Sequence, residues 1–284
     1  MGMPKIFVAT PTTNGLMLSA YVNSVVQMVT RLHAKGMATD YRTIDGYHLV
    51  MQRDMLADAF LKSDATHLLF IDSDMTFEPG LCERLLKCAK PVIGTIYAKR
   101  ALDLGKLKQA VSAHGFDHGL ALAHDWNVRF LGPRLDVQNG LCRVEGIGFG
   151  FTLIERAALL SLAEDCPTYL APNGKDTLRA FFREMSLEPG KVLDLDYSFC
   201  KRWIERGGEV WAYANARIQH VGDFAYGMPF TAYLAALQAS QPKEPSAPAP
   251  AAGTHVNGRP LASHANGAEP AHLVDTAAAA RRSK

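Results

Sequence analysis

The sequence lacks a strong net charge, paired cysteine motifs and long apolar runs. Its 284 residues carry 30 Lys+Arg against 28 Asp+Glu, a net charge of +2, so the basic field that draws proteins onto nucleic acid is missing. The 5 cysteines are odd in number and widely spaced, which disfavours a disulfide framework and a structural zinc site. No segment approaches the roughly 18 uninterrupted apolar residues of a membrane helix. We therefore expect no nucleic-acid partner and no transmembrane segment.

The N-terminal residues also lack the pattern of a secretory signal. The apolar run at 6–9 is too short for a signal-peptide core, and Ile6 stands where myristoylation of Gly2 needs Ser or Thr. Cysteines without a pairing pattern are typical of a reducing compartment. We expect a cytoplasmic protein.

Aromatic residues are absent from 240–284, a segment that holds 12 alanines and 6 prolines. Such a segment buries too little apolar surface to offset the entropy lost on ordering. The sequence therefore predicts a folded domain at 1–239 and a disordered Ala/Pro-rich tail at 240–284.

Short apolar runs alternate with segments of helical spacing in the first third of the chain. The expected strands are 6–9, 41–44, 67–71 and 92–97, and the expected helices are 16–32, 51–61 and 81–88. This alternation is typical of βαβ units and predicts an α/β sandwich with a mainly parallel sheet. The second half is less regular. Its expected elements are an apolar run at 147–154, a helix ending at 162, a helix at 197–206 and a strand at 210–213.

Two acids directly follow the apolar run 68–71, as Asp72-Ser73-Asp74. In a parallel sheet, ligands collect at the carboxyl ends of strands, and alternate residues of an extended chain point the same way. Asp72 and Asp74 can therefore share one space, where a cation would relieve their repulsion. Oxygen ligands suit Mg²⁺ or Mn²⁺, which in turn neutralises a diphosphate. The alternative is that these residues only shape a turn.

Asp196 lies at the start of the helix expected at 197–206. An Asp in this place commonly caps a helix, and the helix dipole favours its charge. The same position would hold an ionised carboxylate ready to take a proton from a hydroxyl. Both interpretations stay open on the residues alone.

Other candidates are isolated polar groups near strand ends. Lys99 and Arg100 follow the strand at 92–97 and could hold diphosphate oxygens. His220 follows the last strand, whereas three further histidines, His114, His118 and His124, fall in a Gly- and Asp-containing region that we interpret as a loop. Gly146 and Gly148 would let an acceptor approach the backbone closely, although a tightly packed strand explains the same glycines.

Together these motifs resemble glycosyltransferases of the GT-A fold, close to the family-2-like enzymes. The matching segments, in family order, are Thr10-Pro11-Thr12, Gln52-Arg53-Asp54, 66–75 with its Asp-x-Asp, 94–100, 146–151, 195–200 and His220-Val221-Gly222. The resemblance implies a Rossmann-like α/β/α sandwich and transfer of a sugar from a nucleotide-diphosphate donor with Mn²⁺ or Mg²⁺.

Residue by residue, the resemblance implies a metal at Asp74, with His220 as a further ligand and Asp72 near the metal or the ribose. It makes Asp196 the catalytic base. The donor-binding residues that it implies are Thr10, Pro11, Thr12, Asp45, Arg53, Ser73, Lys99 and Arg100. The sequence departs from the family at two positions, because Asp54 replaces a usual Asn and Leu195 replaces a usual Glu.

We therefore expect a glycosyltransferase of the hexosyltransferase type that uses Asp196 as base and inverts the sugar configuration. Its acceptor would be a glycan, a glycolipid or a protein. Two alternatives stay open. A nucleotidyltransferase would attack phosphorus and release pyrophosphate, and a non-catalytic protein would bind a nucleotide sugar without turning it over.

Overall fold

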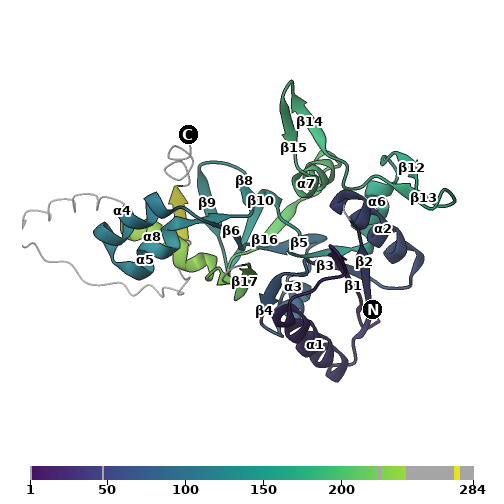
Figure 1. The fold of residues 1–284 in the computed structure, drawn as a ribbon, viewed down its shortest axis with the longest axis horizontal. Helices are drawn as coiled ribbons and strands as arrows, with labels where there is room; N and C mark the ends of the chain where they lie inside the picture. The colour runs from purple at the N-terminus through teal and green to yellow at the C-terminus, as the bar shows by residue number, and fades with distance from the viewer. Residues whose placement is uncertain (1, 47, 223–224, 241–271, 276–284) are drawn as a thin grey trace, which may run out of the picture.

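The structure, a computed structural model, describes residues 2–46, 48–222, 225–240 and 272–275, and an eight-stranded sheet forms its centre (Figure 1). In spatial order its strands are β2 (Ala38–Asp45), β1 (Lys5–Thr12), β3 (His67–Ile71), β11 (Phe151–Glu155), β5 (Val92–Thr95), β16 (Val210–Tyr213), β10 (Leu141–Ile147) and β8 (Val128–Phe130). β11 is antiparallel to both β3 and β5, and β10 is antiparallel to both β16 and β8. The other six strands therefore share one direction. The predicted α/β class is confirmed, with a mixed sheet.

The sheet has helices on both faces, because its central strands are apolar on both sides. Ile6, Val8 and Leu69 face one buried cluster, which α1 (Ser19–Ala34) and α3 (Leu81–Lys87) complete. Phe7 and Phe70, each next in sequence to one of those residues, face the other cluster. The helices on that side are α2 (Leu49–Lys62), α6 (Arg156–Ala163) and α7 (Leu195–Glu205) (Figure 1). Alternation along each strand thus produces the expected three-layer sandwich.

Smaller elements surround the sheet. A three-stranded sheet contains β18 (Ala225–Tyr226), β17 (Ile218–Val221) and β4 (Met75–Phe77), and β6 (Ala98–Leu102) pairs with β7 (His124–Trp126). Two hairpins are β12 (Thr168–Leu170) with β13 (Thr177–Arg179), and β14 (Met185–Glu188) with β15 (Lys191–Leu193). Three helices, α4 (Leu104–His114), α5 (Phe116–Ala123) and α8 (Phe230–Ser240), lie together at one end of the molecule (Figure 1).

Most expected elements are present, and the differences have physical causes. The run at 147–154 is not one strand, because β10 ends at Ile147 and β11 begins at Phe151. The segment interpreted as a histidine-bearing loop instead forms α4, α5 and β7, which contain His114, His118 and His124 respectively. None of the residues of α4 is buried, so this helix lies at the surface.

Most of the predicted tail lies outside the described residues, namely 241–271 and 276–284. Within the described part, α8 ends at Ser240, and β19 (His272–Asp275) pairs antiparallel with β9 (Arg134–Val137). The disorder predicted for 240–284 and the boundary at 239 stay predictions. Among the described residues, none of the helices combines the length and the apolar character that crossing a bilayer requires.

Asp54 is a buried acid that ties α2 to the segment around β13. Its carboxylate accepts hydrogen bonds from the Phe182 N–H at 3.0 Å and the Tyr169 hydroxyl at 2.9 Å. Burial raises the pKa of Asp54 to about 6, although both hydrogen bonds oppose the shift. The residue that departs from the family pattern thus has a structural role in this chain.

Asp54→Asn should flatten the pH dependence of stability between about pH 4 and pH 6. Because the folded pKa of Asp54 lies above the unfolded value of about 3.9, folding favours the protonated form, and stability falls as pH rises through this window. The folding stability that wild type loses over this range is on the order of 3 kcal/mol. The Asn variant should not lose it, because an amide does not titrate. Chemical denaturation at several pH values measures it.

The control is Asp64→Asn, which removes an exposed carboxylate. The hydrogen bond from Lys5 lowers the pKa of Asp64, so this group cannot produce a loss of the same sign. If the free energy of unfolding changes equally with pH in wild type and Asp54→Asn, the buried carboxyl does not titrate in this window.

Candidate functional site

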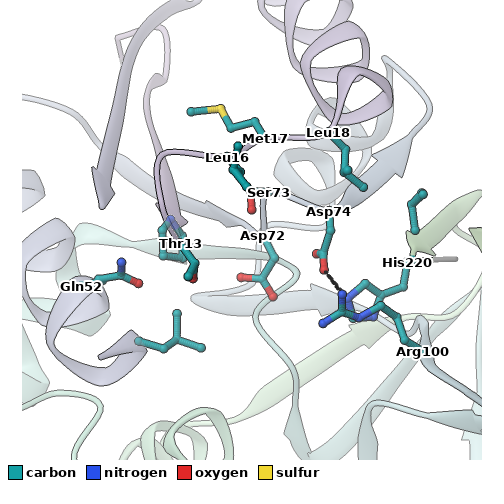
Figure 2. A pocket seen from close by; sticks show the side chains of 14 residues that line it. Thr13, Leu16, Met17, Leu18, Gln52, Asp72, Ser73, Asp74, Arg100 and His220 are labelled. Atoms are coloured by element: carbon teal, nitrogen blue, oxygen red, sulfur yellow. Dashed lines mark hydrogen bonds and ion pairs between the residues drawn. The ribbon is translucent and has the colours of Figure 1, made fainter. Parts of the chain in front are cut away.

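A cavity of about 690 Å³ opens where β1 and β3 end (Figure 2). It is lined by Pro11, Thr13, Leu16, Met17, Leu18, Leu49, Gln52, Asp72, Ser73, Asp74, Arg100, His220, Val221 and Gly222. Its size lies within the usual range of small-molecule sites, and its place at strand carboxyl ends is where α/β sheets bind ligands. Six of the predicted site residues line it: Pro11, Asp72, Ser73, Asp74, Arg100 and His220.

The end of β1 presents a different face from the one predicted. Pro11 and Thr13 line the cavity, whereas Thr10 and Thr12 are buried and point away from it. The Thr10 hydroxyl is hydrogen-bonded to the Tyr21 hydroxyl, and the Thr12 hydroxyl donates to the Ile44 carbonyl at 3.3 Å. The predicted contacts of Thr10 and Thr12 with a nucleotide are therefore corrected, because period-two alternation turns both side chains into the fold.

Asp45 holds a turn instead of lining the cavity. Its carboxylate accepts from the Gly15 N–H at 2.7 Å, and Asn14 and Gly15 have φ values of 57° and 64°. These left-handed residues form a tight turn that brings Leu16 to the cavity wall. Asp45 thus shapes the wall, and the predicted direct contact with the donor has no support in the structure.

Asp74 meets two basic side chains at one oxygen (Figure 2). Its Oδ2 lies 3.0 Å from Nε2 of His220 and 3.2 Å from a guanidinium nitrogen of Arg100. Pairing of β17 with β4 sets this contact, because His220 stands opposite Met75 in the register. Lys99, predicted beside Arg100, instead forms an ion pair with Asp125 at 2.9 Å and does not line the cavity.

The acids and histidine fit a divalent cation only in part. Among the described residues, no three His, Cys, Asp or Glu side chains gather closely enough to hold a metal ion. Asp74 and His220 offer one oxygen and one nitrogen that face each other, a donor set that suits Mn²⁺. Asp72 points to Arg53, so the predicted set of three ligands is not assembled, and Asp74 with His220 would hold the ion.

Arg53 is buried between two acids that lie far apart in the sequence. Its guanidinium donates to Asp72 at 3.1 Å and forms a second ion pair with Asp196, while its side chain is 1% exposed. Burial would lower the pKa of Arg53, but the charges of Asp196 and Asp72 raise it overall. The rings of Phe70, Phe149 and Phe182 lie 5.4–5.8 Å from the guanidinium carbon. Arg53 is thus buried and does not line the cavity, so the direct contact with the nucleotide that the resemblance implies has no support in the structure.

Asp196 lies in the first turn of α7 but does not cap the helix. The cap is Asp194, which accepts from the Tyr197 N–H at 3.1 Å. Asp196 instead accepts from the Phe149 N–H at 2.9 Å and from Arg53. Burial raises the pKa of Asp196 to about 7, the charge of Arg53 opposes the shift, and the charge of Asp72 adds to it. The carboxyl is 14% exposed and does not line the cavity.

Gly146 and Gly148 are closely packed. A Cβ on Gly146 would lie 2.6 Å from the Tyr197 ring, and one on Gly148 would lie 2.0 Å from the Asn127 amide. The packing explanation therefore accounts for both glycines, and no contact in the structure supports the predicted acceptor-side role.

Gln52 is a cavity residue that the sequence did not single out. Its amide donates to the carbonyls of Thr12 at 2.6 Å and Gly46 at 2.9 Å, which fixes the ends of β1 and β2 beside the cavity. Leu16, Met17 and Leu18 were also missed. The Asn14-Gly15 pair, a strong turn signal, could have located them.

No protein-family model and no curated protein matches the sequence. Among solved structures, the protein A197 from STIV is 16% identical, with 78% of this chain and 87% of that chain covered and a TM-score of 0.43. A UDP-glucose pyrophosphorylase complexed with UDP-glucose is 8% identical, with coverages of 77% and 93% and a TM-score of 0.39. A glycosyltransferase involved in glycosylation of the major capsid of PBCV-1 is 12% identical, with coverages of 58% and 68% and a TM-score of 0.30. These similarities concern the fold alone, and none carries the chemistry of those proteins to this chain.

Arg53→Met should destabilise the protein by about 3–5 kcal/mol, because it leaves two partly buried carboxylates without their cation. Chemical denaturation at pH 8 measures the change. Arg42→Met is the control, since Arg42 is exposed and its ion pair with Asp40 contributes about 1 kcal/mol or less.

The double variant Arg53→Met with Asp196→Asn should recover part of the loss, because one of the two uncompensated charges is then removed. A single Arg53→Met variant as stable as Arg42→Met would show that the buried guanidinium does not hold the site together.

Proposed function

We propose that the protein is a glycosyltransferase that moves a sugar from a nucleoside-diphosphate sugar to an acceptor hydroxyl and depends on Mn²⁺ or Mg²⁺. One observation carries the proposal. Asp72 and Asp74 lie on the wall of the cavity at the end of β3, and Arg53 joins Asp72 directly to Asp196. Acidic groups at the donor end and a proton acceptor nearby are what sugar transfer requires.

The donor diphosphate would lie beside Asp74, His220 and Arg100. Asp74 and His220 would hold the cation, which when bound supplies positive charge to the leaving diphosphate. Arg100 adds a guanidinium whose remaining N–H groups can bind phosphate oxygens. The sugar would then sit on the Asp72 side of the cavity, toward Arg53 and Asp196.

Asp196 would act as the base. The acceptor hydroxyl transfers its proton to the carboxylate, the acceptor oxygen bonds to the anomeric carbon, and the bond from that carbon to the diphosphate breaks with its electron pair. The nucleoside diphosphate leaves, so atoms and charge balance. A pKa of about 7 suits a group that takes up and releases a proton near neutral pH. Attack opposite the leaving group inverts the sugar configuration.

The reaction product identifies the chemistry. Purified protein is incubated with Mn²⁺, a panel of nucleotide sugars and glycan, glycolipid or peptide acceptors. Release of nucleoside diphosphate with sugar on the acceptor supports the proposal. Release of pyrophosphate would instead identify a nucleotidyltransferase, and binding of a nucleotide sugar without turnover would identify a non-catalytic protein.

Asp74→Ala should abolish the part of donor binding that depends on the metal, because the cation loses its carboxylate ligand. Titration calorimetry with and without Mn²⁺ measures this difference. Asp125→Asn, which removes an exposed acid outside the cavity, should bind as wild type does. Metal-dependent binding that survives in Asp74→Ala would place the cation elsewhere.

Asp196→Asn should keep donor binding and lower turnover by about a hundredfold or more, the scale of a lost general base. Wild-type turnover should fall as the pH drops through about 7, because the carboxyl must be ionised to accept a proton and burial raises its pKa. The rate profile from pH 5 to pH 9 measures this. An unchanged turnover in Asp196→Asn, or a midpoint near pH 4, contradicts the role.

A further inference from the structure

The guanidinium of Arg100 already occupies the position beside Asp74 where a metal ion would bind. Arg100 and His220 both reach Oδ2 of Asp74, at 3.2 Å and 3.0 Å. A divalent ion bound to Asp74 and His220 would therefore meet the guanidinium of Arg100 at the same oxygen. Because like charges at such distances repel, the ion and Arg100 compete for Asp74.

Arg100 packs closely against Gly222 but is bound only weakly to Asp74. Its stem lies across Gly222, where a Cβ would be 3.1 Å from Cδ of Arg100. A larger residue at 222 would require the stem to shift by a few tenths of an ångström. The side chain is nevertheless 55% exposed, and ion pairs of exposed side chains are weak because solvent screens them. Arg100 can thus leave Asp74 when a stronger anion is present.

A diphosphate is such an anion. A guanidinium presents five N–H donors in a planar fork that binds phosphate oxygens in pairs, and the ion pair with Asp74 engages one of the nitrogens of Arg100. Arg100 lines the cavity, so its remaining donors face the space in which a ligand would lie.

We propose that Arg100 is an internal counter-ion that occupies the cation position at Asp74 until a diphosphate binds it, so that the metal binds weakly alone and tightly with the diphosphate. The inference rests on the proposed function for the nature of that anion. Linkage makes the effect reciprocal, because each ligand raises the affinity of the other by the same factor. We expect that factor to be about fivefold, at the low end of the usual range of coupling between sites, because the ion pair of an exposed Arg100 is weak.

The test measures Mn²⁺ binding to the full chain through the electron paramagnetic resonance signal of free Mn²⁺. Without nucleotide, Arg100→Gln should bind Mn²⁺ about fivefold more tightly than wild type, whereas Arg100→Lys, which keeps the charge, should stay near wild type. Lys99→Gln is the matched control, since it removes the neighbouring charge outside the cavity. With UDP and GDP present, corrected for Mn²⁺ bound by nucleotide in a protein-free blank, the gap between wild type and Arg100→Gln should close.

Equal or weaker Mn²⁺ binding by Arg100→Gln overturns the inference, as does a lack of Mn²⁺ binding by both proteins. If Lys99→Gln gains as much Mn²⁺ affinity as Arg100→Gln, the inference is also overturned, because loss of any nearby positive charge would then explain the effect. The comparison does not use turnover. If no nucleotide sugar reacts but Arg100→Gln still binds Mn²⁺ more tightly than wild type in the absence of nucleotide, the proposed function fails and the role of Arg100 at the cation position stands. A gap of the same size with UDP or GDP present overturns the part of the inference that concerns the diphosphate.

Discussion

The site depends on one buried guanidinium held between two carboxylates. Arg53 comes from α2, Asp72 from the end of β3 and Asp196 from α7, so a single side chain ties three elements together. Taking these charges out of water is costly, and the cost is offset only when they pair well. The surrounding Phe rings exclude water and present their negative faces to the cation. The geometry at both acids therefore follows from where Arg53 is held.

The parts of the fold that the sequence predicts well are those with an unambiguous pattern. β3 begins and ends where its apolar run does, and the acids that follow it reach the cavity because a buried strand must emerge at a sheet edge. β1 shows the limit of the same reasoning. Every residue of β1 from Ile6 to Thr12 is buried, so no alternation of polar and apolar residues reveals which side chains face the ligand. Pro11 lines the cavity, whereas Thr10 and Thr12 do not.

The remaining errors come from polar residues that tertiary partners bury. Gln52, Arg53 and Asp54 are three consecutive polar residues on α2, and all three are buried, a pattern that in sequence indicates a solvent-facing turn of helix. Two of the partners, Asp196 of Arg53 and Phe182 of Asp54, lie more than a hundred residues away, beyond any local signal. The capping role that was one interpretation of Asp196 falls to Asp194, because two acids at one helix start are equivalent until the fold supplies Arg53.

A second connection joins the two ends of the site. The Tyr97 ring packs edge-on against His220, and its hydroxyl accepts from the Gly150 N–H at 3.0 Å. Gly150 follows Phe149, whose N–H donates to Asp196. His220, which faces Asp74, is thus linked to the proposed base Asp196 through Tyr97 and the 148–150 turn. Asp74 is linked to Asp196 by a second route, through the neighbouring Asp72 and Arg53. Two independent links restrict how far one end can move without the other, so a cation or diphosphate that repositions His220 or Asp74 would act on the backbone that orients Asp196.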